Sequence, residues 1–345
     1  MSIESTLQFT HNLHLLAEIG VNHGGDLSTA KKLIALAKES GCNSVKLQAY
    51  KAESLVIEAA KAYWDLNEES TERQIDLFRK YDSFEIEDYK ELYRFAQDLG
   101  IQFGLSIFDA DWVAPLARFV DYFKIASADI TCAPLLEEVS NHQKPVILST
   151  GASTLQEIKT AVSLLEKNGT QNISLLHCIL NYPSRLQESN LSFISCLKKE
   201  FPKYRIGLSD HVAEREFNRF IVARSLGVTI VEKHFTHDRG LPGNDHYHSG
   251  TSEDFRDILK IIFQTDEILG LGTEIQDCEI AARSGARRSI VYSKNLTEGE
   301  VITKECLRYK RPGTGISPMH YRKLVGKKLK KSVLQDEFVE LLDFE

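Results

Sequence analysis

The sequence predicts an α/β protein: a (β/α)₈ TIM barrel followed by a small β-rich domain. Short apolar, β-branched runs alternate with amphipathic helical stretches eight times before about residue 275. The strands read as near-continuous apolar runs, as expected when helices cover a parallel sheet. After residue 285 the pattern changes to short β-type runs with turn signals. A doubly wound open sheet is the alternative architecture.

Each expected strand is short and is followed by an amphipathic helix. The first helix begins at an acidic residue and stops at a glycine. A long polar connecting segment, residues 51–83 and called the polar excursion below, separates the second strand from its helix. The expected strands are 13–21, 44–50, 102–108, 122–127, 145–150, 173–178, 205–211 and 229–235. The expected helices are 26–41, 84–100, 110–118, 134–142, 154–169, 191–201, 214–227 and 252–270.

The change in pattern divides the chain into domains. We expect a barrel domain over residues 1–275, a linker over 276–286 and a second domain over 287–345. Within the second domain a helix is expected to begin at residue 319, in the segment "MHYRKLVGKKL". The basic run there is interpreted as a solvated face whose lysine stems cover apolar surface.

Composition and charge exclude several classes of protein. The chain has 345 residues, and its formal net charge of −7 argues against a general binder of nucleic acid or anionic membranes. The six cysteines form no CxxC pair, the N-terminus lacks the order of a signal peptide, and no apolar run is long enough to span a bilayer. We therefore expect a cytoplasmic protein with free thiols.

Polar side chains gather at the ends of the expected strands, although the strand bodies are apolar. In a (β/α)₈ barrel the active site lies at the C-terminal ends of the strands. Because an unpaired buried charge is costly, polar groups at all eight ends predict an active site there. These groups are Glu18, Asn22, His23, Lys46, Gln48, Ser106, Lys124, Ser127, Asp129, Ser149, Thr150, His177, Asn181, Tyr182, Asp210, His211, Lys233 and His234.

Two lysines and three serines in this set suit an anion. Lys46 and Lys124, with Ser106, Ser127 and Ser149, form a converging group of cations and hydroxyls. Such a group is suited to a phosphate or a carboxylate, because charge-assisted hydrogen bonds are the strong ones.

Two histidines suggest a metal. His211 and His234 end adjacent strands, so both imidazoles can reach one divalent ion that keeps open positions for water and substrate. Glu18 and Asp129 are candidate acid–base groups. Asp245 lies in a loop that its glycines and proline constrain to turn inward. The other histidines of that loop, His237, His246 and His248, are left without an assigned role.

The ordered motifs resemble the sialic acid synthase family, whose members condense phosphoenolpyruvate with an N-acylated mannose-type sugar. The resemblance covers nearly the whole chain and implies a transferase that forms a C–C bond. It rests on "AEIGVNHGG", "VKLQAYKAESL", "KIAS", "PVILSTGAS", "LLHC" followed by "YP", "GLSDH", "EKHFT", "PGNDH" and "YKRPGTGISP", in this order.

The resemblance implies a role for each matching residue. Glu18 and Asp129 are implied to be catalytic. His211 and His234 are implied to bind the metal, with Mn²⁺ expected and Mg²⁺ or Co²⁺ as alternatives. Phosphoenolpyruvate is implied to bind at Lys46, Ser106, Lys124, Ser127, Ser149 and Tyr182, and the sugar at Gln48, Asp245 and Arg311.

The C-terminal part resembles the antifreeze-like (SAF, β-clip) domain of this family. In the family, the arginine of "RPG" reaches into the active site of the partner subunit. Here that arginine is Arg311. The resemblance therefore implies a domain-swapped homodimer.

Departures from the family pattern leave the acceptor sugar open. Ser106 stands where a Thr is usual, and Asp129 stands where many members carry Glu. Leu180 occupies the place of an Asn in bacterial N-acetylneuraminate synthases, and Asn181 is one residue further on, where the side chain points the other way.

Three functions follow. The first is condensation with N-acetylmannosamine to give N-acetylneuraminate and phosphate. The second is the same chemistry on a 2,4-diacetamido-2,4,6-trideoxy hexose, giving legionaminate or pseudaminate, which a more apolar pocket at Leu180 would favour. The third, a non-catalytic carbohydrate-binding protein, has no need of Lys46, Lys124, His211 and His234 together.

Overall fold

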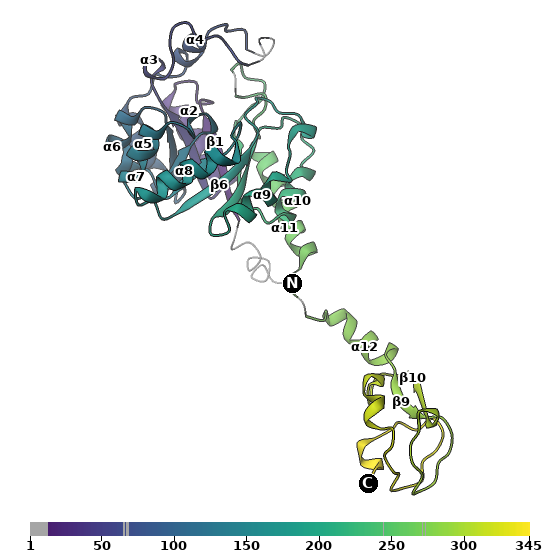
Figure 1. Cartoon of the computed structure of the whole chain (residues 1–345). Coiled ribbons are helices and arrows are strands. Elements are labelled where there is room, and N and C mark those ends of the chain that lie inside the picture. The colour runs from purple at the N-terminus through teal and green to yellow at the C-terminus, as the bar shows by residue number, and fades with distance from the viewer. Residues whose placement is uncertain (1–12, 65, 67–68, 244, 271, 273) are drawn as a thin grey trace. The chain divides into compact units, whose positions relative to one another are not determined.

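The computed structural model describes residues 13–64, 66, 69–243, 245–270, 272 and 274–345. The chain divides into two compact units, with the division after Gly270 (Figure 1). The expectation that no signal peptide is present falls largely on residues 1–12, which lie outside the described part. Among the described helices, none is long and apolar enough to cross a membrane.

The first unit confirms the predicted barrel and excludes the open sheet. Eight parallel strands close in sequence order, with β1 paired to both β2 and β8. Their ends lie within two residues of the predicted ones. The strands are β1 (His14–Gly20), β2 (Ser44–Ala49), β3 (Gln102–Ile107), β4 (Tyr122–Ile125), β5 (Val146–Ser149), β6 (Ile173–Cys178), β7 (Arg205–Asp210) and β8 (Ile230–His234).

Helices surround the strands and begin at the caps that the sequence contains. The Asp26 side chain accepts a hydrogen bond from the Thr29 amide at the start of α2, and a Thr–Glu capping box starts α8. The polar excursion after β2 contains α3 (Ala52–Leu55) and α4 (Gln74–Arg79). The remaining helices are α2 (Leu27–Glu39), α5 (Ile86–Asp98), α6 (Ala110–Leu116), α7 (Ala133–Asn141), α8 (Leu155–Lys167), α9 (Phe193–Glu200), α10 (Asn218–Ser225) and α11 (Ser252–Leu269).

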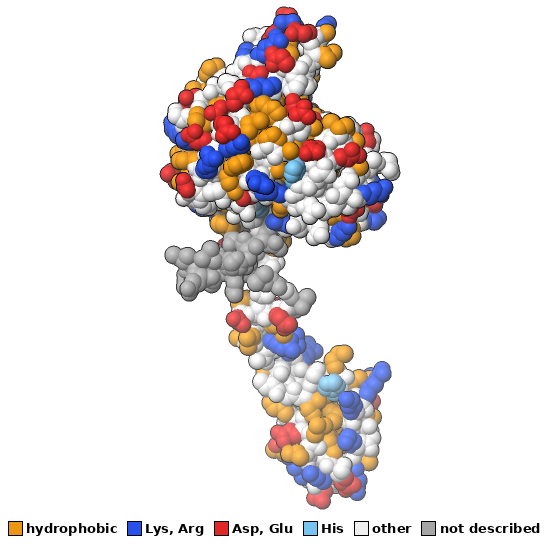
Figure 2. Space-filling view, turned by 90° about the vertical axis from the view of Figure 1, so that its left-hand side faces the viewer, with side chains coloured by type: hydrophobic (Ala, Val, Ile, Leu, Met, Phe, Trp, Pro, Cys, Tyr) orange, Lys and Arg blue, Asp and Glu red, His pale blue; other side chains and the backbone are white. Residues whose placement is uncertain are grey.

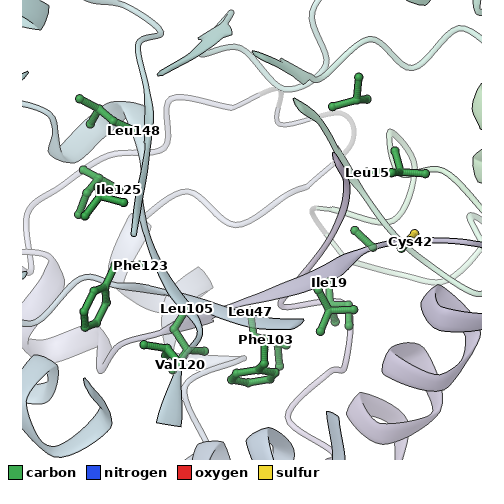
Figure 3. Close-up of a cluster of buried hydrophobic side chains, with 14 of the residues drawn as sticks. Leu15, Ile19, Cys42, Leu47, Phe103, Leu105, Val120, Phe123, Ile125 and Leu148 are labelled. Carbon is green, nitrogen blue, oxygen red and sulfur yellow. The ribbon is translucent and has the colours of Figure 1, made fainter. Parts of the chain in front are cut away.

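Side chains alternate between the two faces of each barrel strand, as a period of two requires. One face is apolar and packs against the helices; Figure 3 shows Phe103, Leu105, Phe123 and Ile125 in this layer. The other face lines the barrel interior. Its lower layer is a separate apolar cluster of Leu16, Tyr122, Ile147, Leu176 and Ile230. Polar side chains follow towards the C-terminal ends of the strands, where the candidate site lies.

The second unit has its own core and corrects one prediction. Its sheet pairs β9 (Ser289–Tyr292) antiparallel with β10 (Leu307–Lys310), and α12 (Ile280–Ala286) lies within the predicted linker. The helix predicted from residue 319 is wrong: Pro318–Lys323 form only a short 3₁₀ helix. The chain then passes through Gly326 at φ +88°, a left-handed conformation that a right-handed helix cannot contain.

The surface carries both signs of charge. On the face shown in Figure 2, acidic and basic side chains are interspersed over the barrel unit. Most lysines of the basic run 321–331 in the second unit are exposed, in agreement with a solvated face. This mixed surface is consistent with the moderate net charge of −7.

Candidate active site

A pocket of about 530 Å³ lies at the C-terminal ends of the barrel strands. Its volume is in the range of small-molecule sites. The structure brings most of the predicted residues together here: Glu18, Lys46, Gln48, Lys124, Ser127, Asp129, Ser149, Tyr182, His211, His234 and Asp245 all line it.

Among the residues that were given a specific role, two do not line this pocket. Ser106 is in register with Gln48 on the neighbouring strand, and its buried hydroxyl has no hydrogen-bond partner among the described residues. Arg311 belongs to the second unit, directly after β10. The roles predicted for both residues stay predictions.

Two buried lysines form the cationic part of the pocket. The Nζ of Lys46 lies 2.5 Å from one carboxylate oxygen of Glu18, and the other oxygen accepts a hydrogen bond from Gln48. The Nζ of Lys124 donates to the Ser149 hydroxyl at 2.7 Å. Burial lowers the pKa of Lys46 to about 7, although the Glu232 carboxylate opposes this shift. An anionic ligand would favour the charged form of Lys46.

Glu232 is a buried pocket residue that the sequence analysis missed. Its carboxylate lies 3.6 Å from the Nζ of Lys124 and accepts a hydrogen bond from the Ser209 hydroxyl at 2.7 Å. Burial alone would raise the pKa of Glu232, but Lys124 and Lys46 outweigh it and lower the pKa to about 2. A signal existed: Glu232 stands two residues before His234, on the same face of β8.

Asp129 differs from the other carboxylates of the pocket. It is half-buried in a 3₁₀ turn after β4, and burial raises its pKa to about 6, with Lys124 opposing the shift. A carboxyl group with such a pKa can both give and take a proton near neutral pH. Glu18, by contrast, is held in an ion pair with Lys46.

The two predicted metal ligands are neighbours, with ring centroids 5.4 Å apart. The Nδ1 of His211 lies 2.8 Å from the carbonyl oxygen of Ile179, so this nitrogen donates and Nε2 remains for a ligand. The Nδ1 of His234 lies 3.2 Å from a carboxylate oxygen of Asp245. His234, Asp245 and His248 each offer one donor atom, and these atoms lie within 4.8 Å of one another. The donor set of His234, Asp245 and His248 fits a divalent ion.

Other polar residues at the strand ends face away from the pocket. The prediction that the polar groups at all eight strand ends belong to one active site is therefore wrong for these residues. His23 stacks on Phe84 at a centroid distance of 4.3 Å, and the His177 ring bonds to the carbonyl of Ser189. Lys233 donates to Asp210 at 2.8 Å on the outer face of the strands. His23 lies in the turn after β1. For His177 and Lys233, the alternation along the strand is the reason, because neighbours in sequence point to opposite faces.

Behind the histidines lies a buried ion cluster. The guanidinium of Arg219 on α10 donates two hydrogen bonds to Asp210, at 2.8 and 2.9 Å. Asp210 also accepts from Lys233, and each of these two residues directly precedes a candidate metal ligand. The cluster therefore holds the ends of β7 and β8 together.

The rest of the pocket is mainly a wall of apolar and aromatic side chains, supplied largely by the excursion after β2, and Gln74 of this excursion also lines it. The sequence analysis described this excursion as polar, but several of its side chains line the pocket. Leu180, at the position that departs from the family pattern, lines it too. Asn181 is exposed and bonds to the carbonyl of Pro183. The apolar and aromatic members of the wall are Tyr50, Leu55, Val56, Tyr63, Leu77, Phe78, Tyr81 and Phe108.

Comparison with known proteins matches both units. Residues 33–274 match the NeuB family, and residues 287–345 match the SAF domain. The chain is 36% identical to N,N'-diacetyllegionaminic acid synthase of Campylobacter jejuni over 331 residues. This match covers 94% of this chain and 98% of the relative. It is 30% identical to human N-acetylneuraminate-9-phosphate synthase, over 96% of this chain and 93% of the relative.

A solved structure agrees with this match. The crystal structure of the N-acetylneuraminic acid (sialic acid) synthetase of Leptospira borgpetersenii superposes with a TM-score of 0.70 at 33% identity. The superposition covers 79% of this chain and 90% of that one.

Proposed function

The chain belongs to the NeuB family of sialic acid synthases, and on this basis we propose that it condenses phosphoenolpyruvate with an open-chain N-acylated amino sugar. The products would be a 2-keto-3-deoxy acid and phosphate. The observation that carries the proposal is one pocket in which two buried lysines face a His–Asp donor group. A non-catalytic sugar-binding protein would have no use for this combination.

The lysine side of the pocket is proposed to hold phosphoenolpyruvate. Lys46 and Lys124 offset the charges of its phosphate and carboxylate, and Ser127 and Ser149 supply hydroxyl donors. Fixed cations in a buried site also stabilise charge that develops during the reaction, which is usually the largest catalytic contribution.

The histidine side is proposed to hold a divalent ion and the sugar aldehyde. His211 and His234 would be ligands, with Mn²⁺ as the expected ion and Mg²⁺ or Co²⁺ as alternatives. When bound, such an ion would act as a Lewis acid that polarises a carbonyl oxygen. Asp245 lies beside His234, and Gln48 lines the same pocket; both would orient the sugar.

In the proposed reaction, carbon 3 of phosphoenolpyruvate forms a bond to C1 of the sugar, whose C=O double bond opens and whose oxygen takes up a proton. Water adds to carbon 2 of phosphoenolpyruvate. The C–O bond to phosphate then breaks, which leaves the keto group. Asp129 takes the proton of the water, since its raised pKa suits this exchange. Glu18, held by Lys46 and Gln48, would orient the reactants.

The role of Asp129 predicts a pH dependence. Its carboxyl group must be ionised to accept a proton, so kcat/KM should fall as the pH drops through about 6. Asp129→Asn should lower kcat by about 10²–10⁴-fold, the usual contribution of a general base. The measurement is kcat/KM from pH 5 to pH 8 for both proteins. If kcat/KM of Asp129→Asn falls at low pH in the same way as that of the wild type, another group must carry out the proton transfer.

For the acceptor, we propose a 2,4-diacetamido-2,4,6-trideoxy hexose, and the apolar wall with Leu180 supports this choice. A 6-hydroxyl placed against such a wall without a partner would cost about 1–3 kcal/mol, whereas a 6-methyl group would not. The 36% identity to legionaminic acid synthases points the same way. N-acetylmannosamine is the second candidate, supported by the 33% identity to the Leptospira enzyme.

Phosphate release tests the reaction and its acceptor. With phosphoenolpyruvate and Mn²⁺, we expect release with the diacetamido sugar and its loss on addition of EDTA. Release with N-acetylmannosamine alone would reverse the order of the two candidates. Release with neither sugar would contradict the proposed activity.

Leu180→Asn tests the specificity directly. Because the new amide offers a partner to a hydroxyl group, the ratio of kcat/KM values should move towards N-acetylmannosamine by about 10-fold or more. Asn181→Leu is the matched control, since Asn181 is exposed and bonds to its own loop. A ratio that stays the same in Leu180→Asn would remove Leu180 from the specificity argument.

We also propose a cytoplasmic homodimer in which Arg311 completes the pocket of the partner subunit. The support is the matching SAF domain with its "RPG" segment and the six free cysteines. Arg311→Ala should mainly raise the KM for the sugar. If the domains are swapped, mixing Arg311→Ala with Lys124→Met should raise activity above the sum of the two proteins through hybrid dimers, because one site in each hybrid is then complete. A mixture no more active than the sum of its components would contradict the swap.

A further inference from the structure

His248 is a buried imidazole beside the candidate metal ligands His211 and His234, and the proposed function above gives it no role. The residue is 1% exposed, and neither Nδ1 nor Nε2 has a hydrogen-bond partner among the described residues. Buried polar atoms are almost always hydrogen-bonded, so a ring with two unpartnered nitrogens requires an explanation. An ion that is shared with its neighbours is one such explanation.

The neighbours of His248 provide the other ligands. One donor atom each of His248, His234 and Asp245 lies within 4.8 Å of the others, and all three side chains are buried. The Nδ1 of His234 also lacks a hydrogen bond, although it lies 3.2 Å from a carboxylate oxygen of Asp245. Two ligand atoms about 2.1 Å from one ion lie about 3.0–3.4 Å apart. The separation of His234 and Asp245 is of this size.

The loop that carries His248 is firmly held in place. The Ser249 hydroxyl donates to the carbonyl of Asp245 at 2.6 Å and accepts from the Asn22 amide at 3.0 Å. The Nε of Arg239 donates to the carbonyl of Ser249 at 2.7 Å. These bonds fix the backbone on both sides of His248, so the ring is preorganised for a ligand role.

We propose that His248 is a ligand of the divalent ion, which it shares with His234 and Asp245. The inference rests on the proposed function and deepens it by adding an imidazole to the donor set. Imidazole nitrogen suits Co²⁺, Fe²⁺, Ni²⁺ or Zn²⁺ better than Mg²⁺. A site with this donor set should therefore bind Co²⁺ more tightly than Mg²⁺.

The competing explanation is that the ring only fills space. Its centroid lies 5.6 Å from that of Tyr182 and 5.0 Å from that of Tyr247, so it is also part of an aromatic group. His248→Phe retains an aromatic ring and removes both nitrogens, whereas His248→Ala removes both nitrogens and the ring. A packing role predicts that Phe restores the wild-type behaviour, and a ligand role predicts that it does not.

The experiment uses the full chain after its metal is removed by a chelator, with Co²⁺ as the probe. Affinity is measured by calorimetry, and the coordination by the visible absorption of bound Co²⁺. The proteins are the wild type, His248→Ala, His248→Phe and the control His237→Ala, which changes a histidine of the same loop outside the donor group. Thermal unfolding of each metal-free protein verifies that it is folded.

We expect both His248 variants to bind Co²⁺ at least about 10-fold more weakly than the wild type, because even loss of an outer-shell partner has an effect of this size. Their Co²⁺ spectra should also change, while His237→Ala stays unchanged. Wild-type affinity and spectrum in either His248 variant would overturn the inference alone and leave the proposed function standing. A wild-type protein that binds no Co²⁺ would overturn both the inference and the proposed metal role.

Discussion

Replacing Lys124 with Met should lower kcat/KM for phosphoenolpyruvate by about 10²–10³-fold, the usual effect of removing one preorganised donor from a buried site. Lys124 is 3% exposed, and its Nζ contacts Ser149 and lies 3.6 Å from Glu232. The variant would leave the Glu232 carboxylate in the anion site with one lysine fewer to balance it. Repulsion between this carboxylate and the phosphate of the substrate would then add to the loss.

The measurement is steady-state phosphate release at several concentrations of phosphoenolpyruvate. Lys167→Met is the control, since it removes a lysine of the same charge from the exposed end of α8. The control should behave as the wild type. A Lys124→Met protein with wild-type KM and kcat would contradict the assignment of the lysine side to phosphoenolpyruvate.

Replacing Asp210 with Ala should lower the free energy of unfolding by about 3–5 kcal/mol, the range measured when one partner of a buried ion pair is removed. Asp210 is the only carboxylate with which the buried Lys233 and Arg219 form ion pairs among the described residues. Its loss would leave both cations buried and unpaired. Because Asp210 and Lys233 precede His211 and His234, the variant should also bind the divalent ion more weakly.

Denaturant unfolding of the metal-free protein measures this effect. Glu91→Ala is the control: it removes the exposed ion pair with Lys31 and should change the stability by only about 0–1 kcal/mol. A loss of stability as small in Asp210→Ala as in the control would show that water or neighbouring groups replace the carboxylate.

The same cluster predicts a dependence of stability on pH. Burial alone would raise the pKa of Asp210, but Lys233 and Arg219 lower it to about 2, from an ordinary value of 3.8. A carboxyl group with a depressed pKa stabilises the fold above its unfolded pKa, and this contribution disappears as the pH falls through the folded one. The contribution of Asp210 should therefore be complete above about pH 4 and should decline towards pH 2.

The amino-acid sequence by itself determined the barrel. Eight apolar runs alternating with amphipathic helices specify parallel strands covered by helices, because each element must bury its apolar face against another. The strand ends were predicted to within two residues for the same reason. The helix expected from residue 319 failed because a single positive-φ glycine, Gly326, interrupts a stretch whose composition is otherwise helical.

The sequence also predicted many of the polar residues that line the pocket, since polar residues at apolar strand ends have few structural uses. It missed Glu232 because the prediction for β8 used only the residues at the very end of the strand. The residue that shares its face with His234 stands two positions earlier. The parity of each strand, applied consistently, would have found Glu232 and would have placed Lys233 on the outer face.

Only the tertiary structure decided which residues meet. His248 and Asp245 follow β8 in an irregular loop, where no period relates one side chain to the next, and their approach to His234 depends on hydrogen bonds from Asn22 and Arg239. The apolar wall likewise comes from an excursion whose composition reads as polar. Regular elements repeat their side-chain directions and can be read from the chain, whereas a loop acquires its directions from the contacts that hold it.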